Sequence, residues 1–104
     1  MSDAATEVRE FRIDIPEGEI IDLKSRLAST RWPDAETPDD WSQGLPLEYH
    51  QEFCKYWETE YDWYKTQEKL NQFPQFKSRF DGLDIHFVHV RSKENNARPL
   101  IITH

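Results

Sequence analysis

Residues 76–90 read FKSRFDGLDIHFVHV, and this stretch decides the fold class of the chain. Two short stretches, 76–80 with phenylalanine at both ends and the largely apolar 83–90, flank the dipeptide Asp81-Gly82. Asp-Gly is a strong hairpin signal, because a tight two-residue turn needs positive φ angles that these residues tolerate. The stretch therefore predicts an antiparallel β-hairpin, in which Gly82 has a structural role at the turn.

A further strand is expected after the hairpin. Residues 91–98 are polar, and the run PLIIT at 99–103 follows them and precedes His104. A continuous apolar, β-branched run is typical of a strand buried on both faces. Such a strand needs neighbours to pair its backbone groups. We therefore expect this stretch to be interrupted rather than complete.

The N-terminal part of the chain has two periodic stretches. Residues 11–15 alternate apolar and polar side chains, which favours a short strand or extended segment ending at Pro16. Residues 17–30 then repeat apolar side chains at helical spacing. This helix must end before Trp32-Pro33, because the residue before a proline avoids helical backbone angles.

The next stretch, 31–46, reads RWPDAETPDDWSQGLP and has no regular period. Its prolines, glycine and acidic residues predict an irregular segment. A free linker has no use for large rings, so Trp32 and Trp41 indicate that the segment is pinned across another surface.

Two more helices are expected before the hairpin. Aromatic side chains recur at steps of three and four from Leu47 to Glu60, which predicts a helix with a wide aromatic face. Asp62 can accept backbone N–H bonds as the N-cap of a third helix, running from Trp63 to about Asn71. Because the helices precede the hairpin strands, we predict an α+β fold.

The composition fits a small folded chain with an acidic surface. Of its 104 residues, 37% are hydrophobic and 13% aromatic, so large rings supply much of the apolar material. The formal net charge of −7 opposes nucleic-acid backbones and anionic membranes. Cys54 is the single cysteine, which fits a reducing compartment. The sequence shows neither a signal peptide nor a membrane span, so we expect a cytoplasmic location.

His86 and His89 lie near Asp84 and raise the question of a metal site. On a strand, side chains three positions apart point to opposite faces and cannot share one ion. The neighbouring residues are apolar on both faces, as expected of an inner strand in a covered sheet. We therefore predict no metal site and assign both histidines structural, hydrogen-bonding roles.

Other candidates for catalysis are equally weak. His50 and Cys54 lie one helical turn apart, but a single cysteine on an aromatic helix face is usually a small hydrophobic residue. Asp39 and Asp40 are adjacent in the irregular segment and are expected to be solvated rather than a pair of catalytic carboxylates. Phosphate-binding, zinc-binding and nucleophile-elbow motifs are not found. We predict no catalytic residue and no cofactor within this sequence.

Several ordered stretches resemble one enzyme family. They are RWP at 31–33, WSQG at 41–44, YDWYKTQEKLNQFPQF at 61–76, DGLDIHFVHVRS at 81–92 and RPLIITH at 98–104. Together they resemble the N-terminal region of the microsomal-type epoxide hydrolases, which have the α/β-hydrolase fold. The resemblance runs from about Phe11 to His104.

The resemblance implies three regions. Residues 1–10 would be a flexible N-terminus, residues 11–75 a helical segment that wraps the catalytic domain and its lid, and residues 76–104 the truncated start of the hydrolase core with its first three strands. His104 matches the first residue of a His-Gly-Trp-Pro turn whose backbone helps to form the oxyanion hole. Residues with implied structural roles are Trp32, Trp41, Phe53, Trp57, Asp62, Trp63 and Gly82.

The resemblance also implies a mechanism. An Asp carboxylate attacks the epoxide, two lid tyrosines stabilise the opening oxygen, and a His with an acidic partner activates the water that hydrolyses the ester. In the family all of these lie beyond the residue matched by His104, so the chain alone is expected to be inactive. The implied partners are the remainder of its own hydrolase domain, a small-molecule epoxide in the intact enzyme and a second copy in a homodimer. The implied biological role is detoxification.

One alternative from another class stays open. The Tyr49, Phe53 and Trp57 face of the second helix could make the chain a free-standing interaction module, since an exposed apolar patch of that size marks a binding surface. The codons after His104 distinguish the two hypotheses. Gly-Trp-Pro supports the hydrolase, and a stop codon supports the module.

Overall fold

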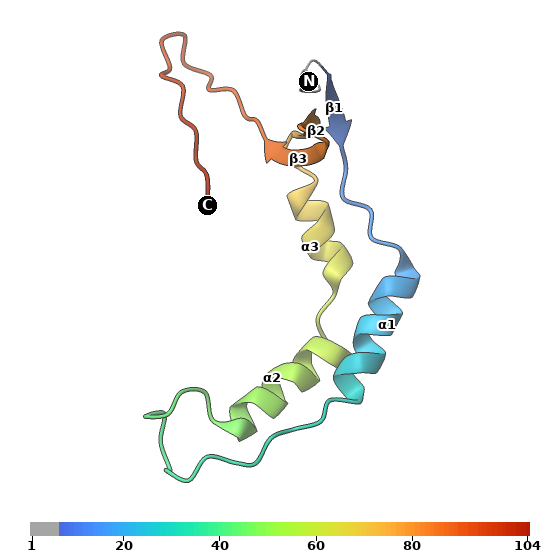
Figure 1. Ribbon diagram of the computed structural model, residues 1–104, viewed down its shortest axis with the longest axis vertical. Coiled ribbons are helices and arrows are strands. Elements are labelled where there is room, and N and C mark those ends of the chain that lie inside the picture. Colours follow the sequence, from blue (N-terminus) through green and yellow to red (C-terminus); the bar gives the residue numbers. More distant parts are fainter. Residues whose placement is uncertain (1–6) are drawn as a thin grey trace. The chain divides into compact units, whose positions relative to one another are not determined.

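The structure is a computed structural model that describes residues 7–104 (Figure 1). In chain order its elements are β1 (Val8–Phe11), α1 (Glu17–Ala28), α2 (Leu47–Thr59), α3 (Trp63–Leu70), β2 (Gln75–Phe80) and β3 (Leu83–Val88). The helices and the three-stranded sheet confirm the α+β class. No helix among the described residues is long and apolar enough to cross a membrane.

The chain divides into two compact units, and the division differs from the boundary expected at 75/76. One unit contains residues 14–67, and the other contains the residues up to 13 together with 68–104. The difference arises because β1, from the N-terminal part, pairs with β2 from the C-terminal part. The expected wrapping segment therefore contributes to both units.

The sheet has the order β1-β2-β3, and both strand pairs are antiparallel. The hairpin is confirmed, with Phe80 opposite Leu83 and the turn formed by Asp81 at φ 48° and Gly82 at φ 79°. Two successive positive φ angles are those of the type I′ turn, whose twist matches that of the flanking strands. Gly82 is needed here because an L side chain at this φ is strained.

We expect Gly82→Val to loosen the hairpin. A β-branched side chain in the left-handed region costs about 1–3 kcal/mol. The amides of Ser78 and Ile85, which face each other across the hairpin, should exchange with solvent roughly 5- to 30-fold faster when this cost is about 1–2 kcal/mol. Gly18→Ala is the control, since Gly18 lies in helix α1 without a positive φ. Equal exchange rates in the two variants would refute the requirement for glycine.

Of the strand or extended segment predicted at 11–15, the strand begins earlier in the chain and ends at Phe11, and residues 12–15 have no regular secondary structure. Strand β1 is Val8–Phe11, and the backbone beyond it is engaged by a side chain. The Ile13 N–H donates to Asn71 Oδ1 at 2.8 Å, and Asn71 Nδ2 donates to the Ile13 carbonyl at 2.8 Å. These groups are thus unavailable to a strand ladder. The expected flexible N-terminus is also wrong for residues 8–10, which belong to β1, while residues 1–6 lie outside the described part.

The strand predicted at 99–103 is also wrong for this structure. Residues 99–104 have no regular secondary structure, and Leu100, Ile101 and Ile102 are 81%, 86% and 80% exposed. Within the described residues no strand lies beside this run to pair its backbone. Strand β3 is likewise an edge strand, not the inner strand that its apolar side chains predict.

The unit of residues 14–67 contains the predicted helices. Helix α1 packs against α2, and its last turn is followed by Thr30, whose hydroxyl donates to the Leu27 carbonyl at 2.8 Å. The segment between α1 and α2 is irregular, as predicted. Asp62 Oδ1 accepts the Tyr64 N–H at 2.9 Å at the start of α3, which is the contact of an N-cap.

Candidate functional site: the aromatic surface of α2

The candidate site is an exposed apolar surface, and we identify it from the burial of the hydrophobic side chains. Among residues 7–104 no hydrophobic side chain is buried, and the two buried residues, Gln75 and Ser78, are polar. Folded chains owe most of their stability to apolar burial, and large exposed apolar patches mark surfaces that bind something else. The chain therefore has apolar surfaces suited to being covered, and several of the exposed aromatic rings among them are on α2.

The aromatic surface of α2 is formed by Phe53, Tyr56, Trp57 and Tyr61. Their spacing of three and four residues brings them to one face, where they line a shallow pocket of about 320 Å³. Phe53 and Tyr56 are each 53% exposed. The Phe53 and Trp57 rings meet edge to face, with centroids 6.4 Å apart. This ordered but open arrangement can receive an apolar side chain from another surface.

Local contacts fix the C-terminal end of this surface. At the end of α2 the N–H groups of Glu60 and Tyr61 both donate to the Tyr56 carbonyl, at 2.8 and 3.0 Å. The Tyr61 hydroxyl forms a short hydrogen bond with the Thr66 hydroxyl on α3. The ring is thereby held beside Phe53 and Trp57 although it lies beyond the helix.

The other flank of α2 carries Cys54 and Glu58, which are half-buried. Cys54 lies with Leu27 and Trp32 around a small pocket of about 240 Å³. This placement gives Cys54 apolar neighbours. The Trp32 ring lies 6.4 Å from the His50 ring, so the irregular segment is held against α2 at this point.

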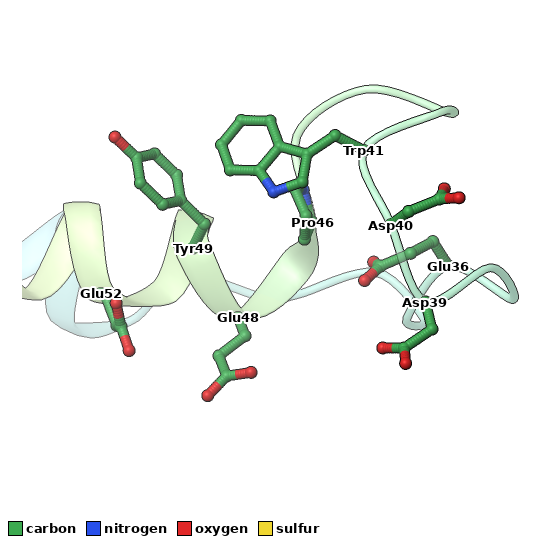
Figure 2. Close-up of a pocket in the computed structure, with 8 residues that line it drawn as sticks. All are labelled: Glu36, Asp39, Asp40, Trp41, Pro46, Glu48, Tyr49 and Glu52. Atoms are coloured by element: carbon green, nitrogen blue, oxygen red, sulfur yellow. The ribbon is translucent and has the colours of Figure 1, made fainter.

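Trp41 pins the irregular segment at a second point of α2. Its ring meets the Tyr49 ring edge to face, with centroids 5.1 Å apart, and Figure 2 shows both rings on the same side of the helix. Beside them lies a pocket of about 320 Å³. It is lined by Glu36, Asp39, Asp40, Trp41, Pro46, Glu48, Tyr49 and Glu52, without a basic residue.

The carboxylates of this acidic pocket are partly organised by the backbone. Glu36 Oε2 accepts the N–H of Leu47, the first residue of α2, at 2.9 Å, and this bond lowers the pKa of Glu36. Hydrogen bonds from the Ser42 hydroxyl and backbone N–H lower the pKa of Asp40. Both groups are therefore ionised at neutral pH. Helix α2, whose N-cap is Pro46, thus obtains a side-chain acceptor for its first N–H from a residue eleven positions upstream in the irregular segment.

The histidines considered as ligands have local partners. His86 Nε2 lies 2.9 Å from Gln75 Oε1, and the His86 ring meets the Phe11 ring at 5.1 Å. The His89 ring lies 6.5 Å from that of Phe76. Asp84 forms ion pairs with Arg9 at 3.2 Å and with Arg79 at 3.8 Å. In the described part of the chain, no three His, Cys, Asp or Glu residues are grouped to hold a metal ion.

Other residues singled out from the sequence lie apart from these clusters. His104 lies in the exposed stretch after β3. Trp63 Nε1 donates to Gln67 Oε1 at 3.1 Å, and the same oxygen accepts the Ile15 N–H at 2.9 Å. The side-chain amides that hold the extended residues 13–15 were not predicted, because hydrophobic periodicity carries no information about amide side chains. The contact of the Glu36 carboxylate with the start of α2 was also missed, because hydrophobic periodicity does not show which carboxylates accept a backbone N–H.

The chain has an α+β fold, and the aromatic side chains of Phe53, Tyr56 and Trp57 on α2 are exposed, which is typical of a surface that another surface covers. Comparison with known proteins shows what kind of chain this is. Residues 8–104 match the family described as "Epoxide hydrolase N terminus", and the chain belongs to this family.

Known relatives agree with this assignment. A Stigmatella aurantiaca protein provisionally named an epoxide hydrolase is 48% identical over 97 residues, which cover 93% of this chain and 22% of the relative. Epoxide hydrolase 1 of Sus scrofa is 33% identical over 101 residues, again 22% of its length. The crystal structure of juvenile hormone epoxide hydrolase from the silkworm Bombyx mori matches 88% of this chain and 22% of that chain, with a TM-score of 0.78 and 29% identity. The chain thus spans about a fifth of the length of these relatives.

Proposed function

We propose that this chain is the N-terminal part of an epoxide hydrolase and that it wraps and supports the catalytic domain and lid of that enzyme. The observation that carries the proposal is the absence of buried hydrophobic side chains among residues 7–104 in a chain of this family. A segment that serves as a wrap leaves its apolar side chains for the surface that it wraps. The irregular segment pinned through Trp32 and Trp41 supports the same role.

The proposed reaction of the whole enzyme is the addition of water to an epoxide, which gives a vicinal diol through an Asp-ester intermediate. We assign neither the nucleophile, the base nor the lid tyrosines to this chain. The Tyr61 hydroxyl is bonded to Thr66, and the Tyr64 hydroxyl donates to the Ile15 carbonyl at 3.3 Å. Desolvation, with a smaller contribution from nearby carboxylates, raises the pKa of Tyr64, so its hydroxyl stays protonated in this structural contact.

The proposal includes a role for His104. Its backbone would open the loop after the third hydrolase strand, where α/β-hydrolases place one oxyanion-hole N–H. We also propose a role in detoxification, a cytoplasmic location and a homodimer for the intact enzyme. The location rests on the single cysteine, which fits a reducing compartment.

A chimera tests the proposal. In it, residues 8–104 of this chain replace the matched region of the Stigmatella aurantiaca relative, and the unmodified relative is the control. We expect the chimera to form diol from styrene oxide within about tenfold of the control rate, because a supporting segment leaves the reacting groups in place. A chimera that folds cooperatively but forms no diol, beside an active control, would contradict the proposal.

The second candidate function is a free-standing interaction module, which the open aromatic surface of α2 favours. A module would bind a separate protein without any contribution to epoxide hydrolysis. The gene sequence after the codon for His104 discriminates directly, since Gly-Trp-Pro supports the hydrolase and a stop codon supports the module.

A further inference from the structure

The aromatic surface of α2 has an acidic border on one side. Along α2, Glu48 and Glu52 lie one turn apart, and they line a shallow groove whose other lining residues include Lys55, Tyr56 and Glu60. In Figure 2 the carboxylates of Glu48 and Glu52 project from the helix on the side opposite the Trp41 and Tyr49 rings. An apolar pocket thus lies beside a row of negative charge.

The groove has an excess of negative charge, since three carboxylates, those of Glu48, Glu52 and Glu60, and one lysine, Lys55, line it. The Lys55 Nζ lies 4.0 Å from a carboxylate oxygen of Glu58, which is not among the residues that line the groove. No ion pair is formed by Glu48 or Glu52 with any residue in 7–104. Like charges on one helix face repel, so their arrangement favours a partner that brings positive charge.

The relatives indicate where such a partner comes from. The match covers 22% of the Stigmatella aurantiaca relative, so most of that protein lies outside the matched region. A segment of the same chain is held close to α2 at high effective concentration, which favours it over a separate protein.

We propose that the aromatic surface of α2 is the docking site of one segment of the remaining hydrolase chain, which places a large apolar side chain among Phe53, Tyr56 and Trp57 and an arginine or lysine against Glu48 and Glu52. This inference rests on the proposed function and adds the chemistry of the partner. An apolar anchor surrounded by charges is the usual arrangement of an interface, in which the anchor supplies affinity and the charges fix the register. Arginine suits the site well, because its guanidinium binds a carboxylate and stacks on an aromatic ring.

The first test is the thermal stability of the chimera with Glu48→Gln and Glu52→Gln. If a basic side chain faces these carboxylates, the double variant should have a Tm about 2–4 °C lower, and 0.5 M NaCl should abolish most of the difference. If no basic group faces them, removal of like charges leaves the Tm unchanged or raises it. Glu19→Gln is the matched control, since Glu19 and Glu48 both lie in the first turn of a helix and lose the same helix-dipole contribution.

The second test concerns the apolar anchor. Phe53→Ala in the chimera should lower the Tm by about 5 °C or more, and Phe53→Leu should cost less than half of that, because leucine retains most of the contact. A Tm for Phe53→Ala within about 1 °C of the unmodified chimera would overturn the docking site. So would a dimer of the isolated chain that Phe53→Ala dissociates while the chimera is unaffected, since the occupant would then be a second copy.

These outcomes separate the two proposals. A folded chimera that forms no diol contradicts the proposed function. A chimera that forms diol, but in which the Glu48/Glu52 and Glu19 variants have equal stability, contradicts only the basic partner proposed for α2.

Discussion

Styrene oxide incubated with the 104-residue chain alone should give diol only at the uncatalysed rate. Epoxide opening needs a nucleophile and a group that stabilises the developing oxyanion, and enzymes that have both gain about 10⁶-fold or more over water. The proposal places all of these groups in the remainder of the enzyme. The chimera should therefore exceed the isolated chain by about 10⁶-fold per mole in the same assay.

The control for this comparison is heat-denatured chain, which accounts for reaction of the epoxide with side-chain nucleophiles such as the Cys54 thiol. Turnover by the isolated chain that is proportional to its concentration, exceeds one equivalent and persists through repurification would show that an active site lies within these residues. The assignment of a supporting role would then be wrong.

A second large effect is expected for His104→Ala in the chimera. The imidazole is proposed to hold the turn after the third hydrolase strand, and this turn supplies an oxyanion-hole N–H. Loss of one such donor costs on the order of 10²–10³ in rate, and its displacement through a lost side chain should cost about 10- to 100-fold. Hydrolysis of the ester should slow by this factor, because the tetrahedral intermediate forms in that step. Alkylation of the nucleophile should change less.

Rapid-quench measurement separates the two steps, and accumulated ester is the expected signature. His89→Ala is a suitable control, because His89 lies against Phe76 and is assigned no part in the loop. Unchanged ester hydrolysis in a well-folded His104→Ala chimera would mean that His104 only fills space at the end of the strand.

Local sequence signals predicted the elements that local physics determines. The Asp81-Gly82 turn, the spacing of aromatic residues along α2 and the Asp62 contact at the start of α3 all depend on neighbours a few residues away. Strand β1 could not be predicted from such local signals. The position of strand β1 depends on its pairing with β2, more than sixty residues away in the sequence. It also depends on Asn71, whose side chain accepts the Ile13 N–H just beyond the strand.

The run at 99–103 shows the opposite case, in which a strong local signal is not realised. Its β-branched residues favour a strand, but a strand forms only when a neighbour satisfies its backbone groups. The described residues place β1, β2 and β3 together and leave Leu100 to Ile102 exposed. The aromatic face of α2 was evident from the spacing of its rings, whereas the acidic pocket beside Trp41 depends on where the irregular segment meets α2.

We propose that the remainder of a hydrolase covers the apolar surfaces of this chain, and amide hydrogen exchange on the isolated chain and on the chimera can detect this cover. The amides of α2 and of residues 100–102 should exchange at least about tenfold more slowly in the chimera, because docking stabilises both segments. Equal exchange rates for α2 in the isolated chain and in a folded, active chimera would mean that no such surface covers α2.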